Sequence, residues 1–412
     1  MKISNLRAIE ILDSKGEPTL KVKLKTDFGI FEASVPSGVS EGKYEALELR
    51  DKEKRYFGKG VRKAVENINK IITTKLRGKN PRKQQEIDKL IIELDGTKNK
   101  SRLGANALTG VSMVIARAGA ASYKLNLYEY LAKLLGLKLK KKELKIPSPS
   151  FLLIEGGSHG GNELDFQEFM IIPTAFSFKE KLQKGAEIYG SLKSILKEKY
   201  GKIAINVGLE GGFTPPIDKT EKALDLIMNA LRIGNYEKET KIALDIASST
   251  FYIKDYYKFE DKIFTNYNLL KFYQDLVKNY PIISLEDPYG EEDWKGFKSI
   301  MKNLGDKVII VGDDLLATNL ERVRKAVEEK AISGLIIKPD QIGTISEVLE
   351  IVKFAKKHNL KIIVSHRGGD TPDSFISDLA VGIEADFIKS GAPTRGERVA
   401  KYNRLLEIEE GF

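Results

Sequence analysis

The sequence predicts an α/β protein in two parts, an α+β domain over residues 1–125 and a barrel of strands and helices over residues 148–412. A length of 412 residues leaves room for a barrel of about 250 residues beside a smaller domain. Short apolar segments that end in a charged residue recur along the C-terminal part at intervals of about one strand–helix unit. A Lys-rich stretch followed by Pro147 and Pro149 separates the two parts, and we interpret residues 126–147 as a linker.

The N-terminal domain is expected to begin with two strands around a turn. Residues 8–12 lead into a turn at residues 13–18, and residues 19–25 then alternate apolar with polar side chains, as expected of a half-buried strand. A third strand is expected at residues 30–35. The small residues after it predict a mobile loop at residues 36–43.

Helices are expected after these strands. Val61, Val65, Ile68 and Ile72 recur at helical spacing, and residues 103–122 are small and apolar enough to form a buried helix. Strands followed by helices indicate an α+β arrangement for the first domain.

The C-terminal part is expected to open with a strand pair. Apolar runs at residues 151–154 and 169–172 lie close together, and helices are expected at about 178–199 and 218–234. Each of the next six predicted strands ends in a charged residue, namely Asp245, Glu286, Asp313, Lys338, His366 and Lys389. A β/α barrel places such strand ends around one mouth, where the active sites of this fold lie. Charged residues often end strands by themselves, but the whole set is difficult to explain by packing.

Asp245, Glu286 and Asp313 end three consecutive predicted strands. Three converging carboxylates repel one another unless a cation neutralises them. Oxygen ligands without Cys or His favour a hard ion, and Mg2+ commonly keeps open positions for water and substrate. A single aspartate at such a position can also cap the next helix. We interpret the three together as a metal site.

Lys338, His366 and Lys389 end the next three predicted strands. A lysine close to a divalent cation and to a second lysine should have a lowered pKa and act as a base. His366 and Arg367 supply donors suited to a carboxylate or phosphate, although Arg367 taken alone can also be a structural ion-pair partner. The arrangement predicts proton abstraction beside a substrate carboxylate, with metal ions stabilising the charge that develops.

Two Gly-rich stretches add acidic groups to the candidate site. Residues 156–161 contain His159 and precede Glu168, while residues 207–213 contain Glu210. Neither stretch is a P-loop, because no Gly-Lys-Ser/Thr follows it. Glycines let the backbone approach a ligand closely, and Glu168 and Glu210 are candidate acids on the face opposite the base. Taken alone, each glutamate is also typical of an ordinary loop.

The chain is basic, since Lys and Arg outnumber Asp and Glu by 68 to 58. The densest basic run, residues 138–145, has no interleaved aromatic residues and no nucleic-acid motif around it, so we expect a solvated surface and no nucleic-acid partner. No apolar run approaches the ~20 residues that cross a bilayer, and the N-terminus lacks the apolar stretch of a signal peptide. A cytoplasmic location without membrane contact is therefore the default expectation.

The motifs at these positions resemble those of the enolase family over essentially the whole chain. So many matches in the same order are very specific. They are, in chain order, ILDSKGEPT, VPSGVSEGKYEALELRD, ELDGTKNKSRLGANAL, GGSHGGNELDFQEFMIIP, VGLEGGF, SLEDP, VGDDLLATN, IIKPDQIGT, VSHRGGDT, IKSGAP and ERVAKYNRLL.

The resemblance implies Mg2+-dependent, reversible dehydration of 2-phosphoglycerate to phosphoenolpyruvate, a lyase reaction of glycolysis and gluconeogenesis. It also implies an α+β capping domain followed by a ββαα(βα)6 barrel, and a homodimer or an assembly of dimers. Two Mg2+ ions per active site are expected, the second arriving with the substrate, a small phosphorylated acid.

The resemblance also implies roles for individual residues. The expected metal ligands are Asp245, Glu286 and Asp313 and, for the second ion, Ser40 in the loop at 36–43. Lys338 resembles the base that removes the C2 proton, and Glu210, with Glu168 beside it, resembles the acid that helps the 3-hydroxyl leave as water. Arg367 is expected to bind the phosphate and Lys389 the substrate carboxylate. The other expected substrate-binding residues are His159, Gln167, His366 and Gly368.

Several positions near the site depart from the family pattern. Leu209 stands where the family usually has Asp, and Glu155 and Asp340 stand where it has Asn. Loss of the carboxylate at Leu209 is expected to shift the pKa of Glu210, and Glu41 adds negative charge to the loop. These changes leave two alternatives open: a paralogue acting on another phosphorylated or carboxylated 2-hydroxy acid, and a binding or scaffold protein without turnover.

Overall fold

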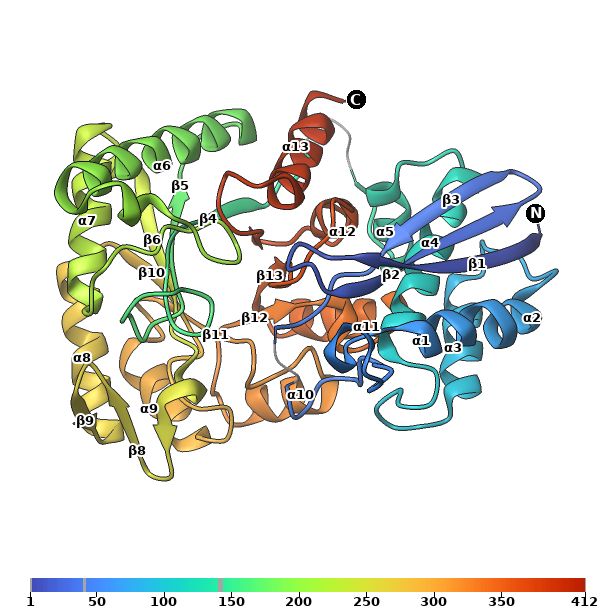
Figure 1. Ribbon diagram of the computed structural model, residues 1–412, viewed down its shortest axis with the longest axis horizontal. Coiled ribbons are helices and arrows are strands. Elements are labelled where there is room, and N and C mark those ends of the chain that lie inside the picture. Colours follow the sequence, from blue (N-terminus) through green and yellow to red (C-terminus); the bar gives the residue numbers. More distant parts are fainter. Residues whose placement is uncertain (1, 40–41, 140–143, 412) are drawn as a thin grey trace.

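The computed structural model describes the chain in three stretches, residues 2–39, 42–139 and 144–411. An N-terminal α+β domain lies beside a larger domain that contains a closed barrel of eight strands (Figure 1). The predicted fold class, an α+β domain followed by a β/α barrel, is confirmed. Within the described stretches, no helix is long and apolar enough to cross a membrane.

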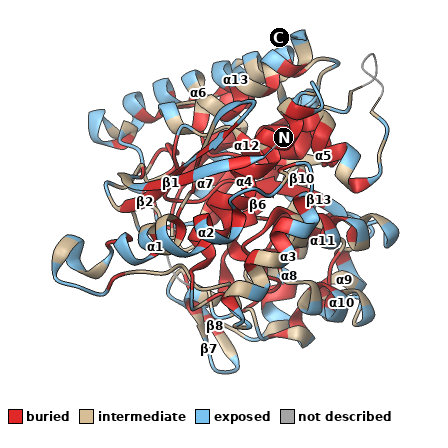
Figure 2. Cartoon of the chain, turned by 90° about the vertical axis from the view of Figure 1, so that its right-hand side faces the viewer, coloured by how far each residue is buried: buried red, intermediate tan, exposed pale blue. Residues whose placement is uncertain are grey.

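The N-terminal domain is built on a three-stranded antiparallel sheet. In spatial order its strands are β1 (Ile3–Leu12), β2 (Pro18–Thr26) and β3 (Gly29–Ser34). In β2 the fully buried Leu20, Val22 and Leu24 alternate with lysines, because successive side chains of a strand point to opposite faces. The sheet packs against α4 (Ala105–Ser122), whose small apolar side chains are almost all buried (Figure 2).

Shorter helices complete this domain. They are η1 (Arg55–Gly58), α1 (Arg62–Glu66), the π-helical turn η2 (Asn67–Ile72), α2 (Thr73–Leu76) and α3 (Gln84–Asp95). The segments α1, η2 and α2 follow one another without a break and pack against β1. They bury Ile68 and Ile72, two of the residues whose spacing predicted a helix there.

The segment expected as a linker, residues 126–147, contains a helix, α5 (Leu127–Leu135). Asn126 and Glu129 form a capping box at its first turn, an arrangement that satisfies otherwise unpaired backbone amides. The helix packs against α4 and against α12 (Phe375–Gly382) of the barrel domain. This part of the segment is therefore folded structure at the junction, because its apolar face is buried between the two domains.

The barrel closes in the spatial order β10, β11, β12, β13, β14, β4, β5, β6. The strands are β4 (Ser148–Glu155), β5 (Glu168–Pro173), β6 (Thr240–Asp245), β10 (Ile282–Glu286), β11 (Ile309–Gly312), β12 (Gly334–Ile337), β13 (Lys361–Ser365) and β14 (Phe387–Lys389). All neighbours are parallel except β5, which runs antiparallel to both β4 and β6. Chain order follows ββαα and then six strand–helix units.

Helices surround the barrel (Figure 1). In addition to α12 they are α6 (Phe178–Tyr200), α7 (Thr220–Ile233), α8 (Asn266–Asn279), α9 (Trp294–Leu304), α10 (Leu320–Glu328), α11 (Ile345–Lys357) and α13 (Gly396–Glu410). Short 3-10 turns are η4 (Lys202–Ile205), η5 (Glu237–Glu239), η6 (Ser248–Phe251) and η7 (Pro339–Gln341). Polar side chains cap several helix starts, namely Ser177, Thr265, Asp293, Asn319 and Thr344.

A second, small antiparallel sheet was not predicted. It consists of β7 (Tyr252–Ile253), β8 (Tyr256–Phe259) and β9 (Lys262–Phe264), inserted between β6 and α8. The insertion explains why the first interval between predicted strand ends, from Asp245 to Glu286, is the longest of the series.

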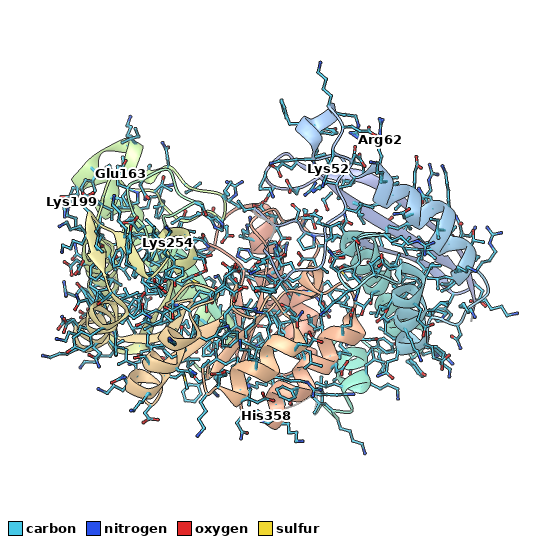
Figure 3. The ribbon with its side chains drawn as sticks, turned by 90° about the horizontal axis from the view of Figure 1, so that it is seen from below. Lys52, Arg62, Glu163, Lys199, Lys254 and His358 are labelled. Atoms are coloured by element: carbon cyan, nitrogen blue, oxygen red, sulfur yellow. The ribbon has the colours of Figure 1, made fainter. Side chains whose placement is uncertain are left out.

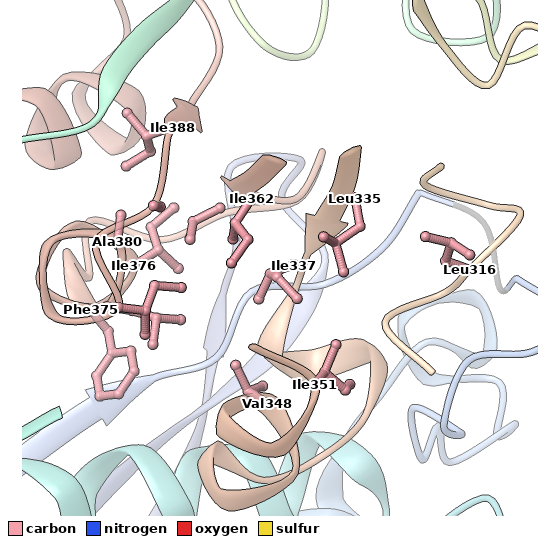
Figure 4. Close-up of a cluster of buried hydrophobic side chains, with 14 of the residues drawn as sticks. Leu316, Leu335, Ile337, Val348, Ile351, Ile362, Phe375, Ile376, Ala380 and Ile388 are labelled. Atoms are coloured by element: carbon pink, nitrogen blue, oxygen red, sulfur yellow. The ribbon is translucent and has the colours of Figure 1, made fainter. Parts of the chain in front are cut away.

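The main core lies between the barrel and its surrounding helices. Figure 4 shows Leu335 and Ile337 of β12 near Val348 and Ile351 of α11, and all four are buried. Between them in sequence, Ile336 faces the barrel interior instead and belongs to a separate small cluster. Alternation of this kind keeps both faces of each strand apolar and leaves only the strand ends for charged groups.

Exposed charges lie on the outside. Lys52, Arg62, Lys199 and His358 are exposed and lie at the periphery of the view in Figure 3. Of the basic run at residues 138–145, only the ends can be placed, because residues 140–143 are outside the described stretches.

Ion pairs and hydrogen bonds join the two domains. Arg117 of α4 binds Asp373 with both terminal nitrogens, each 2.7 Å from a carboxylate oxygen, and Lys100 pairs with Glu347 of α11 at 2.8 Å. Ser37 forms a β-bridge with Gly369. The bridge places Ser37 beside the segment that follows β13, at the C-terminal end of the barrel strands.

Candidate active site

Three carboxylates meet at the C-terminal end of the barrel strands. Asp245 and Glu286 are the last residues of β6 and β10, and Asp313 directly follows β11. In the parallel ladder Glu286 pairs with Asp245 on one side and with Val311 on the other, so the strand ends are level. One oxygen of each carboxylate lies within 4.8 Å of the others, and all three residues are buried. The structure thus brings together the three predicted metal ligands.

The donor set fits a hard divalent cation. All three groups offer carboxylate oxygens, which Mg2+ prefers, and the buried Oδ1 of Asp313 has no hydrogen-bond partner among the described residues. Burial, together with the neighbouring Asp245, raises the pKa of Glu286 well above its usual value. Negative charge is therefore concentrated here beyond what the nearby amines neutralise.

Lys389, the last residue of β14, lies at the centre of this cluster. Its Nζ donates hydrogen bonds to Asp245 at 2.7 Å and to Glu286 at 2.8 Å, and it lies 3.2 Å from Oε1 of Glu168. Burial alone would lower the pKa of Lys389, but the surrounding carboxylates raise it well above its usual value. Lys389 is therefore a permanent cation that links the two halves of the site.

Lys338 follows β12 and faces the same carboxylates. Its Nζ lies 2.5 Å from Oδ2 of Asp313. Burial would lower the pKa of Lys338, but the ion pair with Asp313 outweighs burial and raises it. The expected lowering of the Lys338 pKa applies to a site that holds a divalent cation, and it stays a prediction. Arg367 and Lys389 both push this pKa downward, so the ion pair with Asp313 is what keeps Lys338 charged.

Glu168 and Glu210 lie across the cavity from Lys338. Glu168 begins β5, whereas Glu210 lies in the loop before α7. Oε2 of Glu210 is 3.1 Å from Nε2 of His366, and its Oε1 is 3.5 Å from Nδ1 of His159. The structure therefore groups the two predicted acids with both predicted site histidines.

The two glutamates have opposite pKa shifts. Burial raises the pKa of Glu168 well above its usual value, and the carboxylate of Glu210 adds to this effect. Burial would also raise the pKa of Glu210, but His366, His159 and Arg398 lower it well below the usual value. The pair is thus arranged to hold one proton, preferentially on Glu168.

Arg367 is held at the cavity wall by two carboxylates. Its Nη2 donates to Oε2 of Glu45 at 2.9 Å, and its Nη1 lies 3.3 Å from Oδ2 of Asp340. Burial would lower the pKa of Arg367, but Asp340 and Glu45 raise it. An arginine with this support can present its remaining N–H groups to an anion in a fixed orientation.

One cavity of about 110 Å³ is lined by most of the residues predicted to form the site. They include Gln167, His159, His366, Gly368, Lys338 and Lys389. Glu286 does not line this cavity; it lies deeper and, with Lys389, lines a smaller one inside the barrel. Ser40 and Glu41, in the expected loop, lie outside the described stretches.

Leu209 takes part in the site through its backbone. Its carbonyl accepts a hydrogen bond from Nη2 of Arg398 at 3.2 Å, and its N–H lies 3.5 Å from the carbonyl oxygen of His159. The side chain itself is only half-buried. The low pKa of Glu210 has its own local cause in His366 and His159.

Sequence reasoning did not identify Glu155 as a structural anchor. Its fully buried carboxylate accepts hydrogen bonds from the backbone N–H of Glu210 at 3.0 and 3.2 Å and of Gly212 at 3.1 Å. Its own carbonyl accepts from Asn162 at 3.0 Å. Glu155 therefore holds both Gly-rich stretches against the end of β4. The only sequence signal was its departure from the family pattern.

Sequence reasoning also missed Glu45 and Arg398. Both lie within motifs that carried the resemblance, EALELRD and ERVAKYNRLL, but neither lies at the end of a predicted strand. Their importance depends on contacts with residues more than 30 positions away in the chain.

Comparisons with known families match both domains. The model described as enolase, N-terminal domain, matches residues 3–131, and the model described as enolase, C-terminal TIM barrel domain, matches residues 143–412. Together they span nearly all of the chain.

Curated relatives give the same result along nearly their full lengths. A protein named enolase from Methanocaldococcus jannaschii is 49% identical over 411 residues, covering 99% of this chain and 95% of the relative. One from Methanopyrus kandleri is 49% identical, covering 99% and 96%. A protein named enolase B from Dictyostelium discoideum is 46% identical, covering 100% and 95%.

Proposed function

This chain belongs to the enolase family of lyases, and we propose that it catalyses the reversible dehydration of 2-phosphoglycerate to phosphoenolpyruvate with Mg2+. The observation that carries the proposal is a lysine beside three carboxylates, with a second pair of carboxyl groups across the same cavity. A base and an acid on opposite faces of a bound substrate are what removal of a C2 proton and a C3 hydroxyl requires.

The metal would be held by Asp245, Glu286 and Asp313. When bound, Mg2+ supplies positive charge that stabilises the negative charge developing on the substrate carboxylate. Lys389 contributes permanent positive charge beside the same carboxylates. A second ion, arriving with substrate and bound in part by Ser40, is proposed from the family resemblance alone.

Lys338 is proposed as the base that takes the C2 proton. The amine must be neutral to accept a proton, and in the structure its ion pair with Asp313 opposes this. Once Asp313 serves as a metal ligand, that ion pair is weakened. Burial, Arg367 and Lys389 then act together to lower the pKa of Lys338.

Glu168 and Glu210 are proposed to supply the proton for the leaving hydroxyl. Their opposite pKa shifts keep one transferable proton in a buried part of the cavity. The atoms of the elimination are then all accounted for. Lys338 gains the C2 proton, and the carbon–oxygen bond at C3 breaks as the double bond between C2 and C3 forms. The glutamate pair protonates the departing oxygen to give water.

Arg367 is proposed to bind the phosphate and Lys389 the substrate carboxylate. Gly368, Gln167 and His159 line the same cavity and are proposed to contact the substrate. The family resemblance also supports a homodimer or an assembly of dimers, a cytoplasmic location, and a role in glycolysis and gluconeogenesis; size-exclusion chromatography with light scattering tests the assembly.

One assay tests the proposed reaction. Purified protein is mixed with 2-phosphoglycerate, and phosphoenolpyruvate is followed by its absorbance with Mg2+ and with a chelator. We expect turnover that depends on the metal. Exchange of the C2 proton with deuterium from solvent, without dehydration, would indicate a defective acid step. Neither exchange nor dehydration would contradict the proposal and favour another 2-hydroxy acid substrate or a binding role.

A further inference from the structure

Arg398 lies at the start of α13 and is fully buried behind the active site. Its Nη1 contacts Nδ1 of His366 at 2.7 Å and donates to the carbonyl of Arg367 at 2.6 Å. Its Nη2 donates to the carbonyls of Gly368 at 2.7 Å and Leu209 at 3.2 Å. One guanidinium thus joins the segment after β13 to the loop that carries Glu210.

The contact with His366 constrains the imidazole chemically. A guanidinium has only N–H donors and stays charged in proteins. The ring nitrogen 2.7 Å away must therefore accept a hydrogen bond, so Nδ1 carries no proton. A neutral imidazole with a bare Nδ1 carries its single hydrogen on Nε2.

The hydrogen on Nε2 has a clear recipient. Nε2 lies 3.1 Å from Oε2 of Glu210, and both atoms are buried without a hydrogen-bond partner among the described residues, so each is the available partner for the other. We propose that Arg398 is a positioning residue that fixes His366 in the neutral Nε2–H tautomer and aims this hydrogen at Glu210.

The other two protonation states conflict with the same contacts. An Nδ1–H tautomer would point a hydrogen at the N–H of Arg398 and leave two lone pairs, on Nε2 and Oε2 of Glu210, facing each other. A doubly protonated ring would also place a positive charge against the guanidinium. Burial lowers the pKa of His366 to about 4, and Arg398 opposes the attraction of Glu210 and Asp370 for the charged form.

The tautomer has a consequence for the proposed reaction. A donor on Nε2 stabilises the ionised form of Glu210, and this leaves the transferable proton of the pair on Glu168. That consequence rests on the proposed function, whereas the tautomer itself does not depend on any substrate.

Nitrogen NMR of the histidine side chains tests the tautomer directly. The chain contains only three histidines, so protein labelled with 15N-histidine gives few signals, and the single substitutions His159→Gln, His358→Gln and His366→Gln assign them. His358 is exposed (Figure 3), and its signals serve as an internal comparison from outside the active site. At neutral pH we expect the His366 signals of a protonated Nε2 and an unprotonated Nδ1. An Nδ1–H tautomer or an imidazolium in the wild-type protein overturns the proposal without any further variant.

Two variants test whether Arg398 is the cause. Arg398→Met removes the donor, and Arg404→Met is the matched control. Arg404 lies on the same helix and binds Asp378 through two nitrogens at 2.9 and 3.0 Å, away from the histidines. We expect Arg398→Met to populate the Nδ1–H tautomer or the imidazolium of His366, and Arg404→Met to leave the His366 signals unchanged. An unchanged tautomer in Arg398→Met overturns the role of Arg398.

Activity gives a second readout. We expect kcat to fall roughly ten- to hundredfold in Arg398→Met, with partial recovery in Arg398→Lys, which restores a donor and a charge. Arg404→Met should stay within about twofold of wild type. If the wild-type protein does not dehydrate 2-phosphoglycerate, the NMR result still decides the tautomer, so the proposed function and this inference fail separately.

Discussion

The two ends of the active-site cavity are built in different ways. At one end, Asp245, Glu286 and Asp313 stand at the ends of neighbouring parallel strands. They pair with Lys389 of β14, across the barrel, and with Lys338, which follows the adjacent strand β12. At the other end, Glu210 lies in a loop whose backbone is held by Glu155 and whose carboxylate faces two histidines. We call these the strand end and the loop end of the cavity. The geometry of the strand end comes from the barrel, whereas the geometry of the loop end comes from specific buried polar contacts.

This difference shows where each half of the site is vulnerable. When a side chain on a rigid strand is removed, the backbone keeps its position and only the chemical function of that side chain is lost. A loop anchored by a few buried hydrogen bonds loses position when one acceptor is changed, because the unpaired backbone amides are costly to bury. Substitutions at the two ends should therefore separate chemical effects from positional ones.

The largest effect is expected at the strand end from Lys338→Ala. Without the base, both dehydration and C2 proton exchange should fall by about 100- to 10,000-fold, while the free energy of unfolding should change little in comparison. The measurements are phosphoenolpyruvate absorbance, deuterium exchange at C2 and urea denaturation. Surviving exchange in this variant would exclude Lys338 as the base.

A second test at the same end is Glu286→Gln. Loss of one anionic ligand should weaken Mg2+ binding by at least roughly tenfold, because the remaining carboxylates offer less negative charge to the ion. Titration calorimetry with Mg2+ alone measures this, and Glu291→Gln, a half-buried carboxylate in the loop after β10, is the control. Equal Mg2+ affinity in wild type and Glu286→Gln would remove this residue from the metal site.

At the loop end, Glu155→Gln should act through position. The amide places an NH2 group where the carboxylate accepted backbone N–H groups of Glu210 and Gly212, so we expect a loss of about 1–3 kcal/mol in the free energy of unfolding. A fall in kcat should accompany it. Glu163→Gln, exposed in the neighbouring loop (Figure 3), should change neither quantity. Wild-type stability in Glu155→Gln would contradict its role as an anchor.

The smallest effect on activity is expected for Asp373→Asn, at an ion pair between the two domains whose residues do not line the active-site cavity. Burial would raise the pKa of Asp373, but Arg117 and several hydrogen bonds lower it. Its folded pKa thus lies below the unfolded value of about 3.9, so the stabilisation is fully present above pH ~4 and is lost as pH falls through the folded pKa. We expect the stability difference between wild type and Asp373→Asn to shrink in that range, measured by denaturation at a series of pH values. A constant difference would contradict the linkage.

The structure differs from the sequence-based expectations at particular elements. The six charged strand ends were predictable, because a barrel repeats one strand–helix unit and each repeat exposes its C-terminal residue at the same mouth. The helix α5 was taken for a linker because basic residues follow it directly. The ion pair between Lys338 and Asp313 was not expected, since the proximity of the amine to this carboxylate is not visible in the sequence.

The sequence by itself determined the order of the elements, the alternation of strands and helices along the barrel domain, and the identity of the charged groups at the barrel mouth. These features depend on local periodicity and on residue type. Only the tertiary structure decided which carboxylate is ionised, which nitrogen of His366 carries the hydrogen and which residues hold the Glu210 loop. Protonation and hydrogen bonding depend on distances of about 3 Å between residues far apart in the chain. Such distances arise only when the barrel has closed.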